Sequence, residues 1–130
     1  KKMKRINILL FGIILISGCG KWPDNIKLSV KDVEFGRSAD SIIITTKGNS
    51  WWIDGISLID TTYYFYNDES IDIFGNSFKI EKDFFIVEKL NKTKLSVTVN
   101  ENTTGKERFM RLTFQAGDYF DYIRINQLAE

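Results

Sequence analysis

The residues best suited to chemistry in this sequence are aromatic, and they gather in its central part. Trp51 and Trp52 are adjacent, and residues 63–66 form an unbroken aromatic run, Tyr-Tyr-Phe-Tyr. Exposed Trp and Tyr rings are the usual platforms for the C–H surfaces of sugars, which bind by stacking and apolar burial. This kind of chemistry depends on which rings face solvent.

Strand geometry decides which of these rings can act together. Neighbouring side chains of a strand point to opposite faces, so Trp52 lies on the face opposite to Trp51. By the same alternation, Tyr64 and Tyr66 share one face of their run. A glycan site is therefore predicted on Trp52, Tyr64 and Tyr66, with Asp68 in the following turn supplying hydrogen-bond groups for sugar hydroxyls.

A second interpretation of the same aromatics stays open. Large aromatic side chains are well buried on average, so the middle segment could fold over the domain and bury these rings. Clustered rings that face outward would support ligand binding. Buried rings would instead support a structural spacer, or a protein-interaction subunit of an envelope complex with no sugar site.

Catalytic and metal chemistry lack their usual residues. The chain has no histidine and a single cysteine, Cys19, which rules out a Ser-His or Cys-His nucleophile and a His- or Cys-ligated metal site. A Gly-x-Ser-x-Gly elbow and a Gly-rich phosphate loop are also absent from the sequence. The acids are scattered, and Asp68, Glu69 and Asp72 lack the spacing of a calcium loop. We therefore expect no catalytic residue, metal or cofactor.

Charge argues against nucleic acid as a partner. The full chain has 18 basic and 17 acidic residues, but four of the basic residues stand among the first five positions. Without residues 1–18 the chain is net negative and has no basic patch, which is the electrostatic footprint that nucleic-acid binding requires.

The N-terminal segment is typical of a secretory signal. Basic residues precede an apolar run over residues 6–16, which is about half of the roughly 20 residues that a membrane-spanning helix needs. This length disfavours the alternative, a membrane anchor helix. An Ile-Ser-Gly-Cys box ending at Cys19 resembles the lipobox of bacterial lipoproteins. The resemblance implies a signal peptide over residues 1–18, acylation of Cys19, and a membrane tether over residues 19–25.

From residue 26 onward, short runs of β-forming residues alternate with turn signals. The clearest lies in residues 107–127, where two alternating runs flank Ala116-Gly117-Asp118 and predict a hairpin whose apolar faces need a partner sheet. A bend is expected near residues 31–32. Further strands are predicted at 41–46, 51–59, 78–81, 83–89 and 95–99, and a hairpin at 61–66 and 70–74. Sustained helical spacing is absent from the sequence, so the pattern predicts an all-β antiparallel sandwich.

Three motifs carry a family resemblance. They are Trp-Trp-Ile at residues 51–53, Asn-Thr-Thr-Gly-Lys-Glu-Arg at 102–108 and Ile-Arg-Ile-Asn-Gln at 123–127. With them, the domain over residues 26–130 resembles the BACON domain, an immunoglobulin-like module of Bacteroidetes proteins. The resemblance implies an immunoglobulin-like fold with Trp51 in the core, and the role of the family's second tryptophan falls to Phe84 or Phe85.

The same resemblance directs the functional hypothesis. BACON domains have a proposed association with carbohydrate or mucin and often occur beside glycoside hydrolases, although some members act as spacers. We therefore predict a lipoprotein of the cell envelope, expected at the outer membrane with its periplasmic or surface face left open, that binds a glycan or glycoprotein. Tripeptides at residues 40–42 and 60–62 resemble the Bacteroidetes O-glycosylation signature, with Ser41 and Thr61 as acceptors.

Replacement of the lipobox cysteine tests the predicted attachment to the membrane. Cys19→Ser removes the thiol that would carry the acyl chains, so we expect loss of the protein from the membrane fraction or blocked processing. Mass spectrometry and membrane fractionation measure both effects. An unchanged mass together with unchanged fractionation would show that Cys19 is not lipidated.

Overall fold

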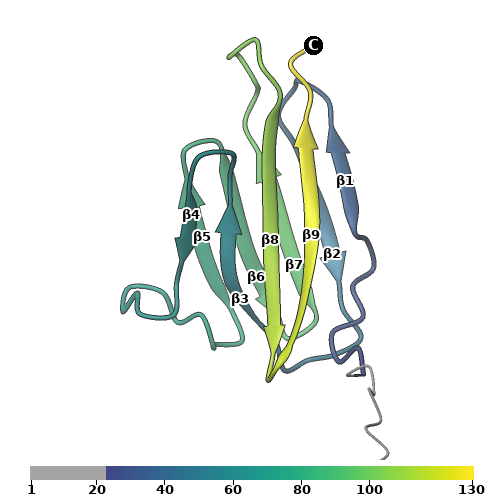
Figure 1. The fold of residues 1–130 in the computed structure, drawn as a ribbon, viewed down its shortest axis with the longest axis vertical. Helices are drawn as coiled ribbons and strands as arrows, with labels where there is room; N and C mark the ends of the chain where they lie inside the picture. The colour runs from purple at the N-terminus through teal and green to yellow at the C-terminus, as the bar shows by residue number, and fades with distance from the viewer. Residues whose placement is uncertain (1–22) are drawn as a thin grey trace, which may run out of the picture.

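The computed structural model describes residues 23–130, and these residues form a sandwich of two β-sheets (Figure 1). The nine strands are β1 (Asp32–Phe35), β2 (Asp40–Thr45), β3 (Trp52–Ser57), β4 (Thr62–Tyr64), β5 (Phe78–Lys82), β6 (Phe85–Asn91), β7 (Lys94–Val99), β8 (Arg108–Ala116) and β9 (Tyr119–Gln127). One sheet has the order β1-β9-β8-β3-β4, and the other has β2-β7-β6-β5. The predicted immunoglobulin-like β-sandwich is confirmed. Within residues 23–130, no helix is long and apolar enough to cross a membrane.

The closing hairpin is the central pair of the larger sheet. β8 and β9 are antiparallel over nine paired positions and are joined by Gly117 and Asp118 alone. Gly117 has φ of +60°, a conformation that glycine adopts without the penalty of a Cβ and that tight hairpin turns require. The alternation predicted for this hairpin is confirmed. Its inward residues are buried, and they are Met110, Leu112, Phe114, Ile123 and Ile125.

The N-terminal segment passes from one sheet to the other. Leu28 forms a bridge with Thr46 at the end of β2, and the Ser29 amide donates to the Thr45 carbonyl at 2.9 Å. Two residues later, the Lys31 carbonyl accepts a hydrogen bond from the backbone amide of Arg124 in β9 at 2.8 Å. From there β1 pairs along β9. The bend predicted near residues 31–32 is therefore this change of sheet. The β1–β9 pairing is parallel, which is an exception to the antiparallel pattern that the sequence predicted.

The middle of the chain differs from its prediction. Only Thr62–Tyr64 forms a strand, β4, which pairs with β3, and the expected partner strand over residues 70–74 is replaced by successive turns. The turns are closed by backbone hydrogen bonds, including Asp68 amide to Phe65 carbonyl at 3.1 Å and Gly75 amide to Asp72 carbonyl at 2.9 Å. The hairpin predicted at residues 61–66 and 70–74 is therefore wrong.

The polar residues of the C-terminal motifs hold the upper end of the sandwich together. Buried Asn102 donates to the carbonyls of Lys106 at 2.7 Å and Leu128 at 3.1 Å. Gln127 is also buried and donates to the Asn100 carbonyl at 2.8 Å, while Arg108 donates to the Gln127 side chain at 3.2 Å. These residues therefore satisfy backbone groups of the β7–β8 connection and serve the scaffold.

Trp51 is a core residue, as the resemblance implied, whereas Trp52 is only half-buried. The Trp51 ring lies 5.2 Å from the Phe114 ring, and its indole N–H donates to the Thr46 hydroxyl at 2.9 Å. Trp51→Ala would leave a large cavity and should lower the free energy of unfolding by about 3–5 kcal/mol.

The adjacent tryptophan serves as the matched control. Trp52→Ala should cost much less in the same denaturant melt, because part of its ring surface stays in contact with water in the folded state. Equal losses for the two variants would contradict this difference in burial.

Candidate functional site

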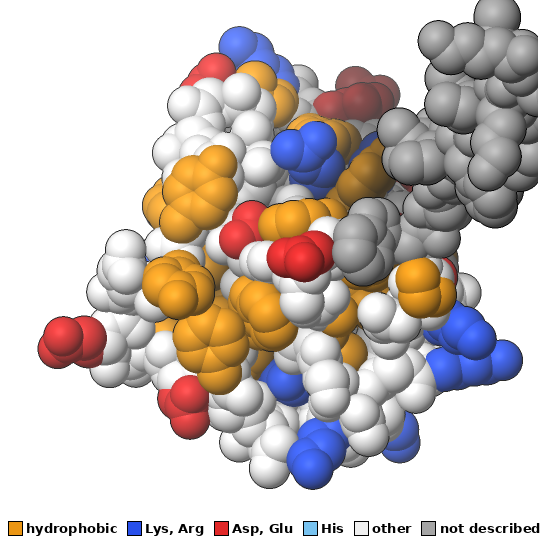
Figure 2. All heavy atoms as spheres, turned by 60° about the horizontal axis from the view of Figure 1, so that its bottom comes forward, with side chains coloured by type: hydrophobic (Ala, Val, Ile, Leu, Met, Phe, Trp, Pro, Cys, Tyr) orange, Lys and Arg blue, Asp and Glu red, His pale blue; other side chains and the backbone are white. Residues whose placement is uncertain are grey.

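Three aromatic rings form a continuous row at the lower end of the sandwich, and we call Trp52, Phe74 and Tyr66 the aromatic row. The Trp52 and Phe74 ring centroids are 5.3 Å apart, and those of Phe74 and Tyr66 are 5.6 Å apart in an edge-to-face arrangement. Tyr66 is 68% exposed and Phe74 55% exposed. Figure 2 shows hydrophobic side chains gathered on this end of the molecule. The row thus offers an apolar platform to solvent.

Buried neighbours fix two rings of the row, Tyr66 and Phe74. Phe65 and Ile73 lie in the hydrophobic core, and each directly precedes an exposed ring, Tyr66 or Phe74. Turn hydrogen bonds between these anchors set the path of the β4–β5 connection, in which both rings lie. Trp52 begins β3 and pairs with Gln115 of β8, so the third ring belongs to the sheet itself.

Tyr64 was predicted to belong to the glycan site, but it lies apart from the aromatic row. It is exposed on β4, and its ring packs over Gly55 of β3, where an added Cβ would approach the ring at 3.3 Å. The bare glycine backbone therefore lets the Tyr64 ring lie flat against the strand. Tyr64 and Tyr66 are both exposed, but Tyr66 lies in the turn after β4, and Phe74 bridges it to Trp52.

Asp68 holds the turn beside the row. Its carboxylate accepts hydrogen bonds from the Ser70 amide at 3.0 Å and the Ser70 hydroxyl at 2.5 Å. These bonds favour the charged form and lower the pKa of Asp68 below its usual value. One carboxylate oxygen is thus engaged in local structure, and the sugar-binding role predicted for Asp68 stays a prediction.

A hollow of about 350 Å³ opens beside the aromatic row, and we call it the basic hollow. Trp52 and Phe74 form part of its lining, which places the platform at its edge. The polar lining consists of Asn49 and Ser50 from the β2–β3 connection, Asn76 from the β4–β5 connection, and Lys89 and Lys92 from β6 and the turn after it. Amide and hydroxyl groups of this kind suit the hydroxyls of a sugar.

Lys89, like Phe74, is a residue of this site that the sequence interpretation missed. It is only 3% exposed, its ammonium donates to the Trp51 carbonyl at 2.9 Å, and it lies 4.3 Å from the centroid of the Trp51 ring. Burial lowers the pKa of Lys89, and the charge of nearby Asp72 opposes that shift. A signal existed, because Lys89 takes an inward position two residues after buried Val87.

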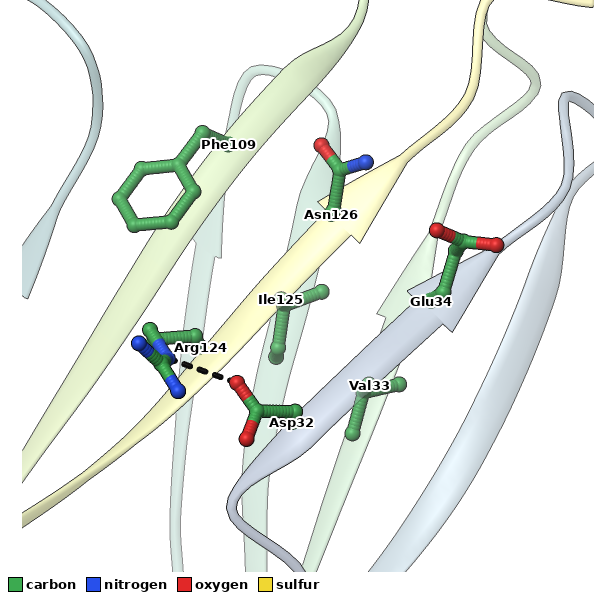
Figure 3. A pocket seen from close by; sticks show the side chains of 7 residues that line it. All are labelled: Asp32, Val33, Glu34, Phe109, Arg124, Ile125 and Asn126. Carbon is green, nitrogen blue, oxygen red and sulfur yellow. Dashed lines mark hydrogen bonds and ion pairs between the residues drawn. The ribbon is translucent and has the colours of Figure 1, made fainter.

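A second hollow lies on the larger sheet, over β1, β9 and β8 (Figure 3). It has a volume of about 270 Å³, and its charged groups include Arg124 and Asp32, which form an ion pair at 2.6 Å. Phe109 is the one aromatic ring in its lining. Arg124 and Asp32 neutralise each other, and a single aromatic ring gives a smaller stacking surface than three rings in contact. This hollow therefore suits a sugar less well.

The remaining predicted positions are distributed over the chain. Cys19 lies outside the described residues. Ser41 is exposed in β2, and Thr61 is exposed just before β4, so both hydroxyls are accessible and their glycosylation stays a prediction. Within residues 23–130, His, Cys, Asp and Glu form no group of three or more that could hold a metal ion.

The buried ammonium makes stability depend on pH in a defined direction. Because the pKa of Lys89 is lower in the folded chain than in the unfolded chain, the unfolded chain binds more protons between the two values. Wild type should therefore gain stability relative to Lys89→Met as the pH rises through the folded pKa towards 10.5, the ordinary value. Denaturant melts at a series of pH values measure this difference. A difference that stays constant with pH would contradict the lowered pKa.

Comparisons with known proteins support the fold alone. No protein-family model matches the chain, and no curated protein matches it. An NMR structure of a protein from Bacteroides thetaiotaomicron is similar, with a TM-score of 0.67 and 18% identity, over 88% of this chain and 96% of that one. A Bacteroides ovatus GH5 xyloglucanase in complex with a XXXG heptasaccharide gives a TM-score of 0.49 at 18% identity. That match covers 78% of this chain but only 18% of the enzyme.

Proposed function

We propose that this chain is a non-catalytic, lipid-anchored module of a bacterial cell envelope that binds glycans through the aromatic row. The observation that carries the proposal is the continuous contact from Trp52 through Phe74 to Tyr66, in which Phe74 and Tyr66 are more than half exposed. Exposed aromatics in contact lose little mobility on binding and present a continuous apolar face. Such a face matches the C–H surface of a pyranose ring.

The polar groups beside the row fit the same ligand class. Asn49, Ser50 and Asn76 can both donate and accept hydrogen bonds, as sugar hydroxyls do. The site is open, so a bound sugar keeps many of its hydroxyls in water and buries little area. Weak affinity for a single sugar unit follows.

The family assignment belongs to the same proposal. Membership of the BACON family rests on the three sequence motifs, and the observed immunoglobulin-like sandwich is compatible with it. Asn102, Arg108 and Gln127 of these motifs act in the scaffold, so the family motifs do not themselves form the binding surface. A function in glycan binding therefore depends on the aromatic row, which lies largely outside the motifs.

A second candidate function rests on other aromatic residues, those of β8 and β9. The outer face of the larger sheet exposes Phe120 and Tyr122 of β9, together with Phe109 of β8. Exposed aromatic residues on a regular sheet face are suited to a protein partner, because aromatics are enriched at protein interfaces. A spacer or protein-interaction subunit would use this face and leave the aromatic row without a ligand.

Substitution in the row distinguishes the two functions. Tyr66→Ala and Trp52→Ala should each weaken glycan binding roughly two- to tenfold, the effect of losing one aromatic contact. Titration calorimetry or NMR shift mapping with mucin glycans and plant polysaccharides would measure the loss. Tyr122→Ala is the matched control, since it removes an exposed tyrosine of β9 that is not part of the aromatic row.

Two results would contradict the glycan site. An equal loss in Tyr122→Ala would move the site to the outer sheet face. A wild-type protein that binds no glycan across the panel would make the spacer or protein-interaction role the better account.

A further inference from the structure

The basic hollow carries positive charge that its own lining does not neutralise. Lys89 and Lys92 are its charged lining residues, and neither Asp nor Glu lines it. The nearby carboxylate of Asp72 influences Lys89 electrostatically but does not line the hollow. A ligand entering the basic hollow therefore meets two ammonium groups and several neutral hydrogen-bonding groups.

Lys89 is held in a partly satisfied state. An ammonium group can donate three hydrogen bonds, and one is made here, to the Trp51 carbonyl. None of the ion pairs within 4.0 Å among residues 23–130 includes Lys89. Burial of a charge is costly unless it is paired and hydrogen-bonded. An anion in the basic hollow would supply the missing partner.

Trp52 carries an unpaired donor beside the same hollow. It lines the basic hollow, and its indole Nε1 is shielded from solvent without a hydrogen-bond partner among the described residues. Buried N–H groups of this kind are normally satisfied, and an unsatisfied one points to an absent partner. Lys89 and Trp52 are both donors, so the partner that suits them is rich in acceptors.

We propose that the basic hollow binds the carboxylate or sulfate group of an acidic sugar whose ring stacks on the aromatic row. The inference rests on the proposed glycan-binding function and names the ligand class for that site. The anionic oxygens accept from Lys89 and Trp52, while Asn49, Ser50 and Asn76 bind neighbouring hydroxyls. Charge-assisted hydrogen bonds are about twice as strong as neutral ones, so the acid group dominates selectivity.

Matched sugar pairs test this selectivity directly. Calorimetry on the full chain would compare methyl glucuronide with methyl glucoside, and galactose 6-sulfate with galactose. Wild type should bind the acidic member of at least one pair about tenfold more tightly or better, the scale of one charge-assisted bond. The pair that shows the difference identifies carboxylate or sulfate as the group bound.

Lys89→Met is the decisive variant, because methionine keeps much of the buried stem and removes the charge. It should lose most of the preference for the acidic sugar over its neutral counterpart. Lys106→Met is the control, since Lys106 is exposed in the β7–β8 connection at the opposite end of the sandwich (Figure 1). A thermal melt establishes that each variant is folded.

A measurement on wild type covers the case in which Lys89→Met fails to fold. The Trp52 indole N–H resonance should shift on addition of the acidic sugar and much less with its neutral counterpart. An unmoved resonance, or the same shift for both sugars, would overturn the inference. Lys92→Met should reduce the acidic preference by a smaller factor, because Lys92 is exposed to water and salt.

The remaining outcomes separate this inference from the proposed function. Equal affinity for acidic and neutral sugars would overturn the acidic selectivity and leave glycan binding in place. Absence of all sugar binding would overturn both. Capture by vesicles containing anionic phospholipid, lost in Lys89→Met and unaccompanied by acidic-sugar binding, would assign the basic hollow to a lipid phosphate and overturn the sugar.

Discussion

The register of β8 against β9 is the constraint on which the rest of the sandwich depends. These strands pair over nine positions, and the side-chain period of a strand is two, so a slip of one residue would turn Met110 and Leu112 to solvent. β1 pairs with β9 and β3 pairs with β8, so both outer neighbours take their position from this hairpin. The aromatic row depends on it too, because Trp52 is placed opposite Gln115 of β8.

The lower end of the core contains a buried charged residue, Lys89, where an apolar side chain would be more stable. An aliphatic side chain at position 89 would fill the same space without the cost of a desolvated charge. Lys89 is tolerated because the Trp51 carbonyl and ring face its ammonium. The same contacts hold the ammonium in one place beside the basic hollow. A rigid, incompletely paired charge can select a ligand, whereas a mobile surface lysine such as Lys92 offers mainly long-range attraction.

The parts of the structure that the sequence could predict are those that obey local alternation. The closing hairpin and the opposed faces of Trp51 and Trp52 both follow from period two. Alternation failed in the β4–β5 connection, because turn hydrogen bonds and the buried anchor Ile73 determine its path. These tertiary constraints leave no periodic pattern in the sequence.

Two residues of the site, Phe74 and Lys89, could not be predicted from the sequence for the same reason. Phe74 joins Tyr66 to Trp52 only because the β4–β5 connection turns back on itself. Lys89 stood in an inward register position, but its partner carbonyl at Trp51 is 38 residues away along the chain. Which inward lysine is buried against a carbonyl depends on packing between sheets, and a single sequence does not encode that contact locally.

The entry point of the chain limits how a ligand can reach the basic hollow. Asn49 and Ser50 line both this hollow and an adjacent one that includes Asn25, so the site and the start of the domain share one end of the sandwich. Five residues lie between Cys19 and Asn25, and the six Cα-to-Cα steps of this segment span at most about 20 Å. Acyl chains on Cys19, as proposed above, would keep this end of the sandwich within about that distance of the lipid surface. A membrane that close would restrict how a long polymer reaches the basic hollow.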